Sequence, residues 1–555
     1  MFGIRLDASP AQRRALAVVA VVTGFIYGSL ARAPYLIWDD DLNIFENPFF
    51  QTGAWSKLWT APHFGMYIPV TSMMWALLYQ LGDGATWPFR LLNLVLHLVN
   101  VGLVVTLVSG ALRRWGLQSS VAVAIAAAIF ALHPQQTAVV SWISGGRDLA
   151  ATAFALGAVV MQMSTKKGRL FWSTLLFAMA LLCKPSVVSV PVALALYAWW
   201  FDRERFRATL QAGAIWTALG IVSVLITRQA QAAMFSVTVP VSLRPVIALD
   251  ALGFYVMKLV WPFPLAADYG RRPDVVWASP SLLIPALLVA IAAAGALYFV
   301  IRRDARFRVA ALWAVLLLPV LGLVPFAYQR ISTVADHYEY LPLVAIVLVV
   351  ALAVARSPRL AGRAGWGLFG ALVTIYAAAS FLRVADWKDN QRFFEDMVRK
   401  NPRSFSAVIN IASVQCERGN WELGLATIQQ TALLARTDAA FLANETFCLF
   451  RGGKIDDAIA RQQRLKEPAV VASLDSNPEA SAVLASSFAG AYLAANRPLR
   501  AFAYLCQAAA VAPQDPVIAR NVATAKEDLR RRGREVTCRG KIPWNLLEQI
   551  VQVLE

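Results

Sequence analysis

Long apolar runs separated by short polar loops fill the first two thirds of the chain. Many approach the length of about 17 to 25 residues that an α-helix needs to cross the hydrocarbon core of a membrane. The runs lie near residues 15–33, 88–110, 119–133, 137–163, 170–184, 187–201, 208–227, 279–301, 309–326, 339–355 and 366–383. The pattern therefore predicts an all-α bundle of about eleven transmembrane helices in residues 1–383.

One apolar segment does not fit as a further span. Residues 246–264, "VIALDALGFYVMKLVWPF", are flanked by loops that both have to lie on the same side of the membrane. We interpret them as an amphipathic helix in the outer interface, with Trp261 at headgroup level. The first apolar run has no small-residue cleavage site and continues into "RAPYLIWDDD", so we expect no cleavable signal peptide.

A different pattern begins after residue 383, where the long apolar runs end and a helical repeat takes over. A turn residue precedes a small residue by five positions three times: Gly419 and Gly424, Gly453 and Ala458, Asn496 and Ala501. The first interval has the 34-residue length of a tetratricopeptide repeat, and the longer second interval implies an insertion around "EPAVVASLDSNP". Residues 384–555 are therefore predicted to form a tetratricopeptide α-solenoid that ends in a capping helix and a tail over 517–555.

Charge supports a membrane protein with a defined orientation. The chain is 58% hydrophobic, only 15% charged, and carries a net charge of +18, of which residues 384–555 contribute +3. The excess lies in short loops between apolar runs: Arg5, Arg13, Arg14, Arg113, Arg114, Lys166, Lys167, Arg169, Arg203, Arg205, Arg207, Arg302, Arg303, Arg306, Arg308, Arg356, Arg359 and Arg363. Basic loops face the cytoplasm, which predicts a cytoplasmic N-terminus, an extracytoplasmic repeat domain and no nucleic-acid partner.

Four of the five cysteines lie in the repeat region, which this topology places in an oxidising compartment. Cys416 and Cys448 occupy nearly equivalent positions in successive repeats, so we pair them and leave Cys506 with Cys538. Four buried free thiols remain the alternative. Cys183, at the end of a predicted span, is expected to be inert.

The sharpest chemical feature is "WDDDLNIFENP" at residues 38–48, immediately outside the first predicted span. Neighbouring carboxylates raise one another's pKa, which suits a group that accepts a proton. The same cluster is also compatible with a divalent cation or with a merely solvated loop.

Other polar groups fall on the same predicted external side, at the ends of apolar runs. Lys184 precedes Pro185, which ends a helix and leaves the ammonium at the outer interface to meet an anion. Taken singly, His97 and Asp148 are more often internally satisfied groups than functional ones. The remaining members are His63, Tyr67, Arg90, His133, Arg147, Asp268, Tyr269, Arg271, Arg272, Arg330, Asp336 and His337.

These segments, taken in order, resemble a known family. They are "DDDLNIFENP", "YIPVTSMMWALLYQLGDG", "RLLNLVLHLVN", "FALHPQQTAVVSWISGGRDLAA", "CKPSVVSVP", "WPFPLAADY" and "ADHYEYLP", followed by the repeats. The order is similar to that of the transmembrane and tetratricopeptide-repeat O-mannosyltransferases and their bacterial relatives, within the GT-C membrane glycosyltransferases. The match covers nearly the whole chain.

The resemblance implies an inverting sugar transfer from a polyprenyl phosphate to a hydroxyl group. The general base would be Asp39 or Asp40, with Asp41 as the fallback. Donor binding would involve Lys184, Arg147, Arg330, His63, Tyr67, His337 and Arg271, with Arg272 in reserve. Where many relatives carry His, Glu and Arg, this chain has Gln136, Ala138 and His337. No metal ligands and no cofactor beyond the lipid-linked sugar are therefore expected, although a divalent metal remains possible.

Three hypotheses follow for the whole protein. The first is an enzyme of the bacterial inner membrane that glycosylates an envelope or appendage protein held by the periplasmic repeat domain, or else a lipid or glycan. The second is a catalytically silent scaffold whose repeats recruit a partner. The third, a transporter, is disfavoured because no inverted repeat or paired interrupted helices are evident.

Overall fold

The computed structural model describes residues 8–231, 239–277, 283–402, 404–430, 436–513, 515–538 and 540–547. The described residues form helices and turns without a β-strand, as the predicted all-α class requires. Two compact units are present, residues 1–389 and 390–555. The predicted domain boundary after residue 383 lies in the last turn of the helix that closes the first unit.

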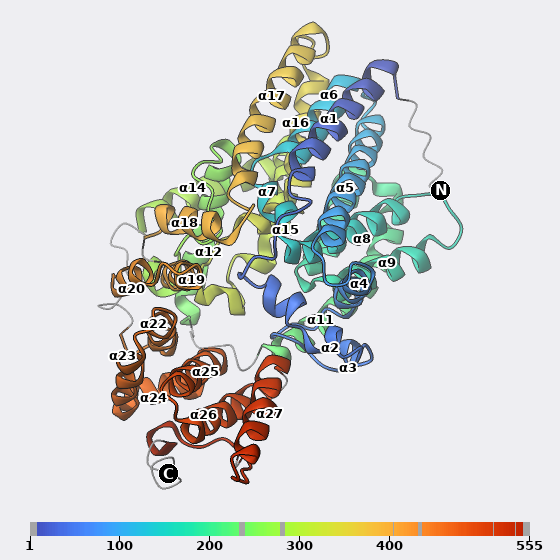
Figure 1. Cartoon of the computed structure of the whole chain (residues 1–555). Helices are drawn as coiled ribbons and strands as arrows, with labels where there is room; N and C mark the ends of the chain where they lie inside the picture. Colours follow the sequence, from blue (N-terminus) through green and yellow to red (C-terminus); the bar gives the residue numbers. More distant parts are fainter. Residues whose placement is uncertain are drawn as a thin grey trace. The chain divides into compact units, whose positions relative to one another are not determined.

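The first unit is a bundle of long helices joined by short helical turns (Figure 1). Its elements are α1 (Pro10–Gly28), η1 (Asp41–Phe45), α2 (Pro48–Gln51), α3 (Lys57–Thr60), α4 (Pro69–Leu81), α5 (Trp87–Arg114), α6 (Ser120–Leu132), α7 (Gln136–Ser141), η2 (Ile143–Gly145), α8 (Gly146–Gln162), α9 (Arg169–Cys183), η3 (Pro185–Ser189), α10 (Val190–Phe201), α11 (Arg203–Ala230), η5 (Val241–Leu243), α12 (Arg244–Val260), α13 (Pro273–Trp277), α14 (Leu283–Ile301), α15 (Ala305–Leu317), η6 (Leu318–Val320), η7 (Ala327–Arg330), η8 (Asp336–Glu339), α16 (Leu343–Arg356) and α17 (Arg363–Ala385).

Helix α6 lies at the centre of this bundle. Its sequence, "SVAVAIAAAIFAL", is apolar all round, and its residues from Val121 to Leu132 are buried. A helix with apolar residues on every face has to be surrounded by protein or lipid. Helices α1, α5, α16 and α17 pack around it, and Figure 1 shows α1, α6 and α17 side by side.

A helix occupies each of the eleven apolar segments, but several bounds differ from the prediction. Helix α1 ends at Gly28 rather than at residue 33, and α15 ends at Leu317 rather than at 326 because Pro319 follows. The segment 137–163 is divided among α7, η2 and α8. Residues 279–282 of another segment lie outside the described part of the chain. Four of the described helices are long and apolar enough to cross a membrane: Trp87–Arg114, Ile143–Gln162, Arg203–Ala230 and Arg363–Ala385.

Helix α12 corresponds to the predicted interfacial helix. It ends at Val260, four residues before the predicted end, because Pro262 and Pro264 cannot continue a helix. Trp261, just past its end, is 65% exposed.

The basic loops and the acidic loop contact different elements of the first unit. Arg114 at the end of α5 forms an ion pair with Asp202 at the start of α11, and Arg308 near the start of α15 lies over the ring of Trp200 at the end of α10. The loop after α1 instead contacts the start of α8, where Asp39 meets Arg147. The side of the membrane that each group faces stays a prediction.

The second unit is a row of helical hairpins. Its elements are α18 (Asn390–Lys400), α19 (Phe405–Glu417), α20 (Trp421–Gln429), α22 (Ala439–Arg451), α23 (Ile455–Ala460), η9 (Arg461–Lys466), α24 (Pro468–Ser476), α25 (Pro478–Ala494), α26 (Pro498–Val511) and α27 (Pro516–Arg531). Three hairpin turns fall where the repeat pattern placed them. Gly419, Gly453 and Asn496 adopt positive φ angles of 87°, 70° and 54°, a conformation that Gly and Asn tolerate best.

Small residues let the paired helices of each hairpin approach closely. Ala458 and Ala501 are fully buried, and a Cβ on Gly424 would overlap Sγ of Cys416. The predicted insertion forms a helix of its own, α24. The assignment of these hairpins to the tetratricopeptide class remains a prediction.

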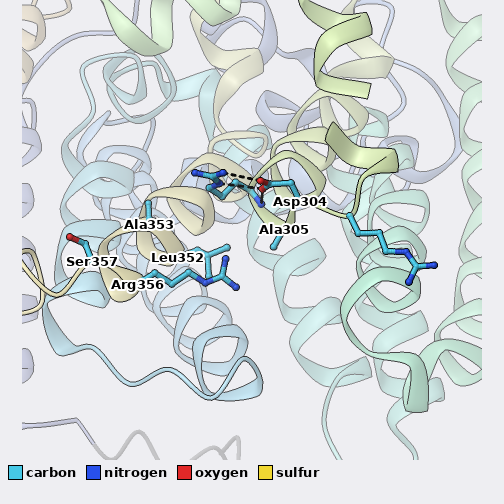
Figure 2. Close-up of a pocket in the computed structure, with 8 residues that line it drawn as sticks. Asp304, Ala305, Leu352, Ala353, Arg356 and Ser357 are labelled. Carbon is cyan, nitrogen blue, oxygen red and sulfur yellow. Dashed lines mark hydrogen bonds and ion pairs between the residues drawn. The ribbon is translucent and has the colours of Figure 1, made fainter. Parts of the chain in front are cut away.

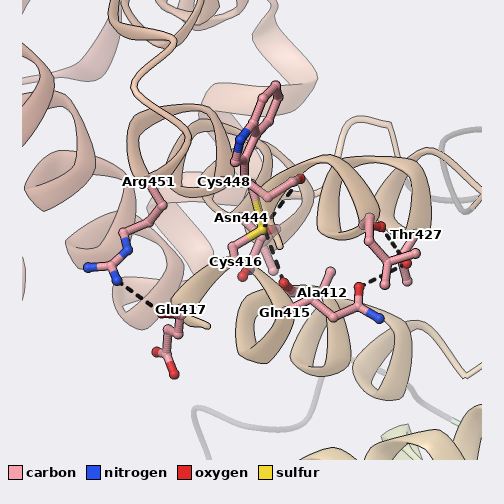
Figure 3. Close-up of a disulfide and its surroundings, with 11 residues drawn as sticks. Ala412, Gln415, Cys416, Glu417, Thr427, Asn444, Cys448 and Arg451 are labelled. Carbon is pink, nitrogen blue, oxygen red and sulfur yellow. Dashed lines mark hydrogen bonds between the residues drawn. A yellow bond between two sulfur atoms is a disulfide. The ribbon is translucent and has the colours of Figure 1, made fainter. Parts of the chain in front are cut away.

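Two disulfides link neighbouring elements of the second unit, in the predicted pairing. Cys416 of α19 is bonded to Cys448 of α22, and Cys506 of α26 is bonded to Cys538 in the segment after α27. Figure 3 shows the first bond between two successive hairpins, next to the carbonyl of Ala412. The alternative of four free thiols is excluded by these bonds. The remaining cysteine, Cys183, is buried.

Candidate active site

The acidic loop after α1 turns its first two carboxylates in different directions. Asp39 has a φ angle of 109°, which is uncommon for a residue with a side chain and is concentrated at functional sites. The π-helix η1 begins directly afterwards, at Asp41. This backbone buries the Asp40 side chain completely, whereas that of Asp39 stays 33% exposed.

Asp40 attaches the loop to the turn before α8. One carboxylate oxygen accepts hydrogen bonds from the backbone N–H and the hydroxyl of Ser144, at 2.8 and 2.7 Å, and the other accepts from the N–H of Leu36 at 3.2 Å. Burial raises the pKa of Asp40, and the nearby Arg90 guanidinium and the Ser144 hydrogen bonds oppose that rise. Both oxygens are thus engaged in holding the loop.

Arg90, near the start of α5, fixes the same region from another side. Its guanidinium donates to the carbonyl oxygens of Ser141 and Pro34, the latter at 2.8 Å. These bonds connect the loop after α1, the start of α5 and the end of α7. The position of Asp40 is therefore set by three separate parts of the chain.

Arg147 lies next to the exposed carboxylate. Its guanidinium is 3.8 Å from Asp39, is only 10% exposed, and lies over the ring of Trp142 at 4.9 Å. It also donates to Sδ of Met66 at 3.0 Å. The planar guanidinium is thereby held between an aromatic face and the acidic loop.

Asp148 and Lys184 extend this arrangement inward. Asp148 lies 4.0 Å from Nε of Arg147 and 2.5 Å from Nζ of Lys184, and the ammonium also lies 5.5 Å from the ring centre of Tyr338. Negative and positive groups thus alternate along Asp39, Arg147, Asp148 and Lys184. We call these four residues the charge chain.

Local sequence explains how the charge chain is assembled. Lys184 follows the last residue of α9 and adopts an extended backbone ahead of Pro185. Arg147 and Asp148 occupy the first turn of α8, after two glycines. A Cβ on Gly145 would overlap the carbonyl of Val139, and one on Gly146 would lie 2.8 Å from the amide oxygen of Asn93. The two glycines of "GGRD" are therefore required by close packing at the start of α8.

A small pocket lies beside Lys184 and Asp148. We call it the Lys184 pocket. It is lined by Asp148, Ala151, Thr152, Lys184, Ser186, Val187, Leu316, Val320, His337, Tyr338, Tyr340, Leu341 and Pro342. Burial, together with the positive charges of Lys184 and Arg147, holds the pKa of His337 well below its usual value, so its imidazole is neutral at pH 7. His337 also packs against Tyr338, with ring centres 4.3 Å apart.

The other predicted site residues have different partners. His63 hydrogen-bonds the carbonyl of Leu42, within the acidic loop, at 2.8 Å. The hydroxyl of Tyr67 donates to the carbonyl of Trp59. The structure thus brings Asp39, Arg147, Lys184 and His337 together, whereas His63 and Tyr67 bond to backbone carbonyls of the segment between α1 and α4.

Arg271 does not join the charge chain. Nη2 of its guanidinium contacts both carboxylate oxygens of Asp250, at 2.6 and 2.5 Å. The side chain of Arg330 lies outside the described residues. Among the described residues, no group of three or more His, Cys, Asp or Glu side chains is arranged to hold a metal ion.

Three residues of the site were not singled out as functional from the sequence. Asp148 was considered an internally satisfied group, yet it contacts both cations of the charge chain. Arg90 was named only within the general set of polar residues, and Tyr338 was not named. The available signal was the presence of two adjacent ionisable residues, Arg147 and Asp148, inside the predicted span 137–163, because charged side chains at membrane depth are usually retained for a pathway or a site.

Comparison with known proteins finds one similar curated protein. No protein-family model and no solved structure matches the chain. Among curated proteins, it is similar to "Protein O-mannosyl-transferase Tmtc2" of Drosophila melanogaster, with 28% identity over 250 residues. The alignment covers 41% of this chain and 26% of the relative, so the chain spans about a quarter of that protein's length. The chain thus resembles a protein O-mannosyl-transferase, which agrees with the resemblance inferred from the order of its motifs.

Proposed function

We propose that this protein is a membrane glycosyltransferase that moves one sugar from a polyprenyl phosphate to a hydroxyl of an envelope or appendage protein, with inversion. The observation that carries the proposal is the pairing of the exposed Asp39 carboxylate with Arg147, next to a pocket that contains Lys184. The carboxylate provides a base that can accept the proton of the acceptor hydroxyl. The fixed cations beside it provide the positive charge that a leaving phosphate requires.

Asp39 is the better general base of the two adjacent carboxylates. Asp40 accepts three hydrogen bonds and has no exposed surface, so an acceptor hydroxyl cannot reach it without disrupting the loop. Asp39 remains one third exposed. In this assignment Asp40 is a positioning residue, and Asp39 takes the proton.

The proposed reaction is a single displacement. Asp39 removes the proton of the acceptor hydroxyl while the oxygen attacks the anomeric carbon of the donor. The bond from that carbon to the phosphate oxygen breaks, and the polyprenyl phosphate leaves with the bonding electrons. Its charge changes from −1 to −2, and nearby cations stabilise the added charge where little water is present.

Lys184 and Arg147 are the proposed phosphate contacts. An ammonium has three N–H donors, so Lys184 can keep its bond to Asp148 and still donate to a phosphate. His337 is neutral and lines the same pocket, which makes it a hydrogen-bonding group rather than a counter-charge. Arg271, paired with Asp250, is not included in this assignment.

The location and the acceptor belong to the same proposal. The eleven helices would cross the bacterial inner membrane with the basic loops in the cytoplasm. The second unit would lie in the periplasm, where its two disulfides can form, and would bring the acceptor close to the site.

The decisive experiment is sugar transfer by the reconstituted full-length protein and its Asp39→Asn variant. Loss of a general base typically slows a reaction by about 10²- to 10⁴-fold, and we expect that loss for Asp39→Asn with wild-type Tm. Asp40→Asn should lower both activity and Tm, because an amide cannot accept all the hydrogen bonds that the carboxylate accepts.

Asp83→Asn is the matched control, because Asp83 is an exposed carboxylate in the loop after α4. It should retain wild-type activity. Undiminished transfer by Asp39→Asn would remove the proposed base, and the absence of transfer by the wild-type protein to any acceptor bound by its repeats would favour the scaffold.

A further inference from the structure

A second pocket lies at the basic end of the first unit, among the residues of two neighbouring helices. It has a volume of about 470 Å³ and is lined by Arg303, Asp304, Ala305, Arg306, Leu352, Ala353, Arg356 and Ser357. The lining comes from the turn before α15 and its first residues, and from the last turn of α16 with the residue after it; Figure 2 labels members of both groups. We call it the basic pocket.

The arginines of this region differ in whether they are already paired. Asp304 caps α15 and pairs with Arg306 at 2.8 Å, an interaction that Figure 2 marks with dashed lines. Hydrogen bonds from Arg306 lower the pKa of Asp304 to about 2, so this pair is ionised and neutral overall. Among the described residues, the side chains of Arg303 and Arg356 form no hydrogen bond or ion pair. The lining thus keeps two uncompensated positive charges.

Arg303 has an unfavourable backbone for its residue type. Its φ angle is 65°, and it follows the end of α14. The N–H of Arg303 bonds to the carbonyl of Val300, and the N–H of Asp304 bonds to that of Phe299. These two bonds define a helix C-terminal motif in which the position of Arg303 is usually glycine. A long cationic side chain therefore stands where the backbone alone favours none.

Exposed apolar side chains precede Arg303, a lining residue of this pocket, by two to six positions in the chain. The last turns of α14 expose Leu297, Tyr298 and Ile301, at 58%, 52% and 69%. A lipid placed with its phosphate at the arginines would have its acyl chains against these side chains. Free phosphate would make no use of them.

We propose that the basic pocket binds the phosphate of an anionic phospholipid, in the leaflet next to the basic loops. Basic pockets between transmembrane helices on the cytoplasmic side are suited to anionic headgroups. Arg356 and Arg303 provide the charge, and the exposed end of α14 provides the contact with acyl chains. This site is separate from the proposed active site and does not depend on glycosyl transfer.

The test compares two double variants of the full-length protein in neutral detergent. Arg303→Gln/Arg356→Gln removes the two unpaired arginines of the pocket. Arg302→Gln/Arg359→Gln removes the same number of charges from the same two loops without touching the lining, since Arg302 is bonded to the hydroxyl of Tyr298. Any change in membrane orientation that results from the loss of loop charge should therefore be the same in both double variants.

Binding of phosphatidylglycerol and of phosphatidylcholine is measured by native mass spectrometry. The wild-type protein and the control should prefer phosphatidylglycerol. The pocket variant should bind phosphatidylglycerol on the order of 30-fold more weakly, because each arginine near a lipid surface contributes roughly a factor of five. Equal weakening in both double variants would overturn the proposal in favour of diffuse attraction.

Two further measurements identify the ligand and exclude misfolding: competition by inorganic phosphate, and lipid binding by an Arg303→Gly variant. Inorganic phosphate at millimolar concentration should not displace phosphatidylglycerol, and full displacement would assign the pocket to free phosphate. Arg303→Gly removes the strain of a positive φ angle in a residue with a side chain, so its Tm should not fall. Its preference for phosphatidylglycerol should nevertheless decrease. An unchanged lipid preference in Arg303→Gly would contradict the role of that side chain.

Discussion

Adjacent residues of the acidic loop have unequal roles, and this inequality depends on one backbone angle. The positive φ of Asp39 separates its carboxylate from that of Asp40. The amino-acid sequence identified both residues as base candidates, because a run of three aspartates is visible in any reading. It could not distinguish them, since the partner that buries Asp40 is Ser144, more than a hundred positions away.

Replacement of Asp148 tests how the charge chain handles phosphate. The Asp148 carboxylate lies against Lys184 and would repel the negative charge of a phosphate bound to the same ammonium. We expect Asp148→Asn to bind polyprenyl phosphate about tenfold more tightly, as judged by product inhibition, and to turn over more slowly because product release is delayed.

Asp250→Asn is the control, because Asp250 is also a buried partner of a cation, Arg271, but lies outside the charge chain. It should leave product inhibition unchanged. Weaker product binding in Asp148→Asn would instead mean that Asp148 is needed to orient the cations.

His337 gives the protein a stability that depends on pH. Its pKa in the folded protein lies below the value of about 6.5 expected when unfolded, so the unfolded state binds more protons in between. The stabilisation is complete above pH 6.5 and is lost as the pH falls through the folded pKa. Tm should therefore decrease on acidification from pH 7 to 5, and less so in His337→Gln. Parallel profiles for the two proteins would exclude this origin. His63, whose pKa burial also lowers, adds to the decrease in both.

At the scale of elements, hydropathy located the helices well and their ends poorly. Apolar length alone was sufficient to predict a helix in each of eleven segments, because burial in lipid or protein imposes the same requirement. The break between α7 and α8 was missed, since "SWISGG" differs little from its apolar surroundings. That break places Ser144 and Arg147 in the site, so the missed boundary mattered more than the predicted helix.

The Cys416–Cys448 disulfide should stabilise the second unit by about 2 to 4 kcal/mol, because it closes a loop of 32 residues. Cys416→Ser/Cys448→Ser should lower the free energy of unfolding of the repeat unit by that amount. A measurement by chemical denaturation under oxidising conditions checks it, and an unchanged midpoint would contradict it.

Gly424→Ala should have a comparable effect without changing any cysteine, because the added methyl overlaps Sγ of Cys416. Gly419→Ala is the contrasting variant, since it adds a methyl in open space but at a positive φ. It should retain the disulfide in a non-reducing mass measurement, whereas Gly424→Ala should form it incompletely.

For the whole molecule, topology is the prediction on which the proposed site depends. Single cysteines introduced at Asp83 and at Arg359, two exposed positions, should be labelled from opposite sides of the membrane. A membrane-impermeant thiol reagent added to intact spheroplasts should reach residue 83 and not residue 359. Labelling of both from one side would invalidate the arrangement of loops deduced from charge.

The all-α class and the division into two units were accessible from sequence because the units use different patterns, long apolar runs and short amphipathic repeats. The charge chain was accessible only in part. Its members come from segments that the topology places on one side, but that rule alone admits many more residues than the four that meet. Selection among them comes from packing, through the close approach at Gly145 and Gly146 and the break at Pro185.

The distances along the chain between these members have a consequence for biosynthesis. Asp39 follows α1, Arg147 and Asp148 begin α8, Lys184 follows α9, and His337 precedes α16. During synthesis Asp39 emerges from the ribosome long before Arg147 and Lys184, and His337 emerges last. An unfinished molecule would therefore be inert toward lipid-linked sugars, and the proposed catalyst would be switched on only when insertion of its membrane part is nearly complete.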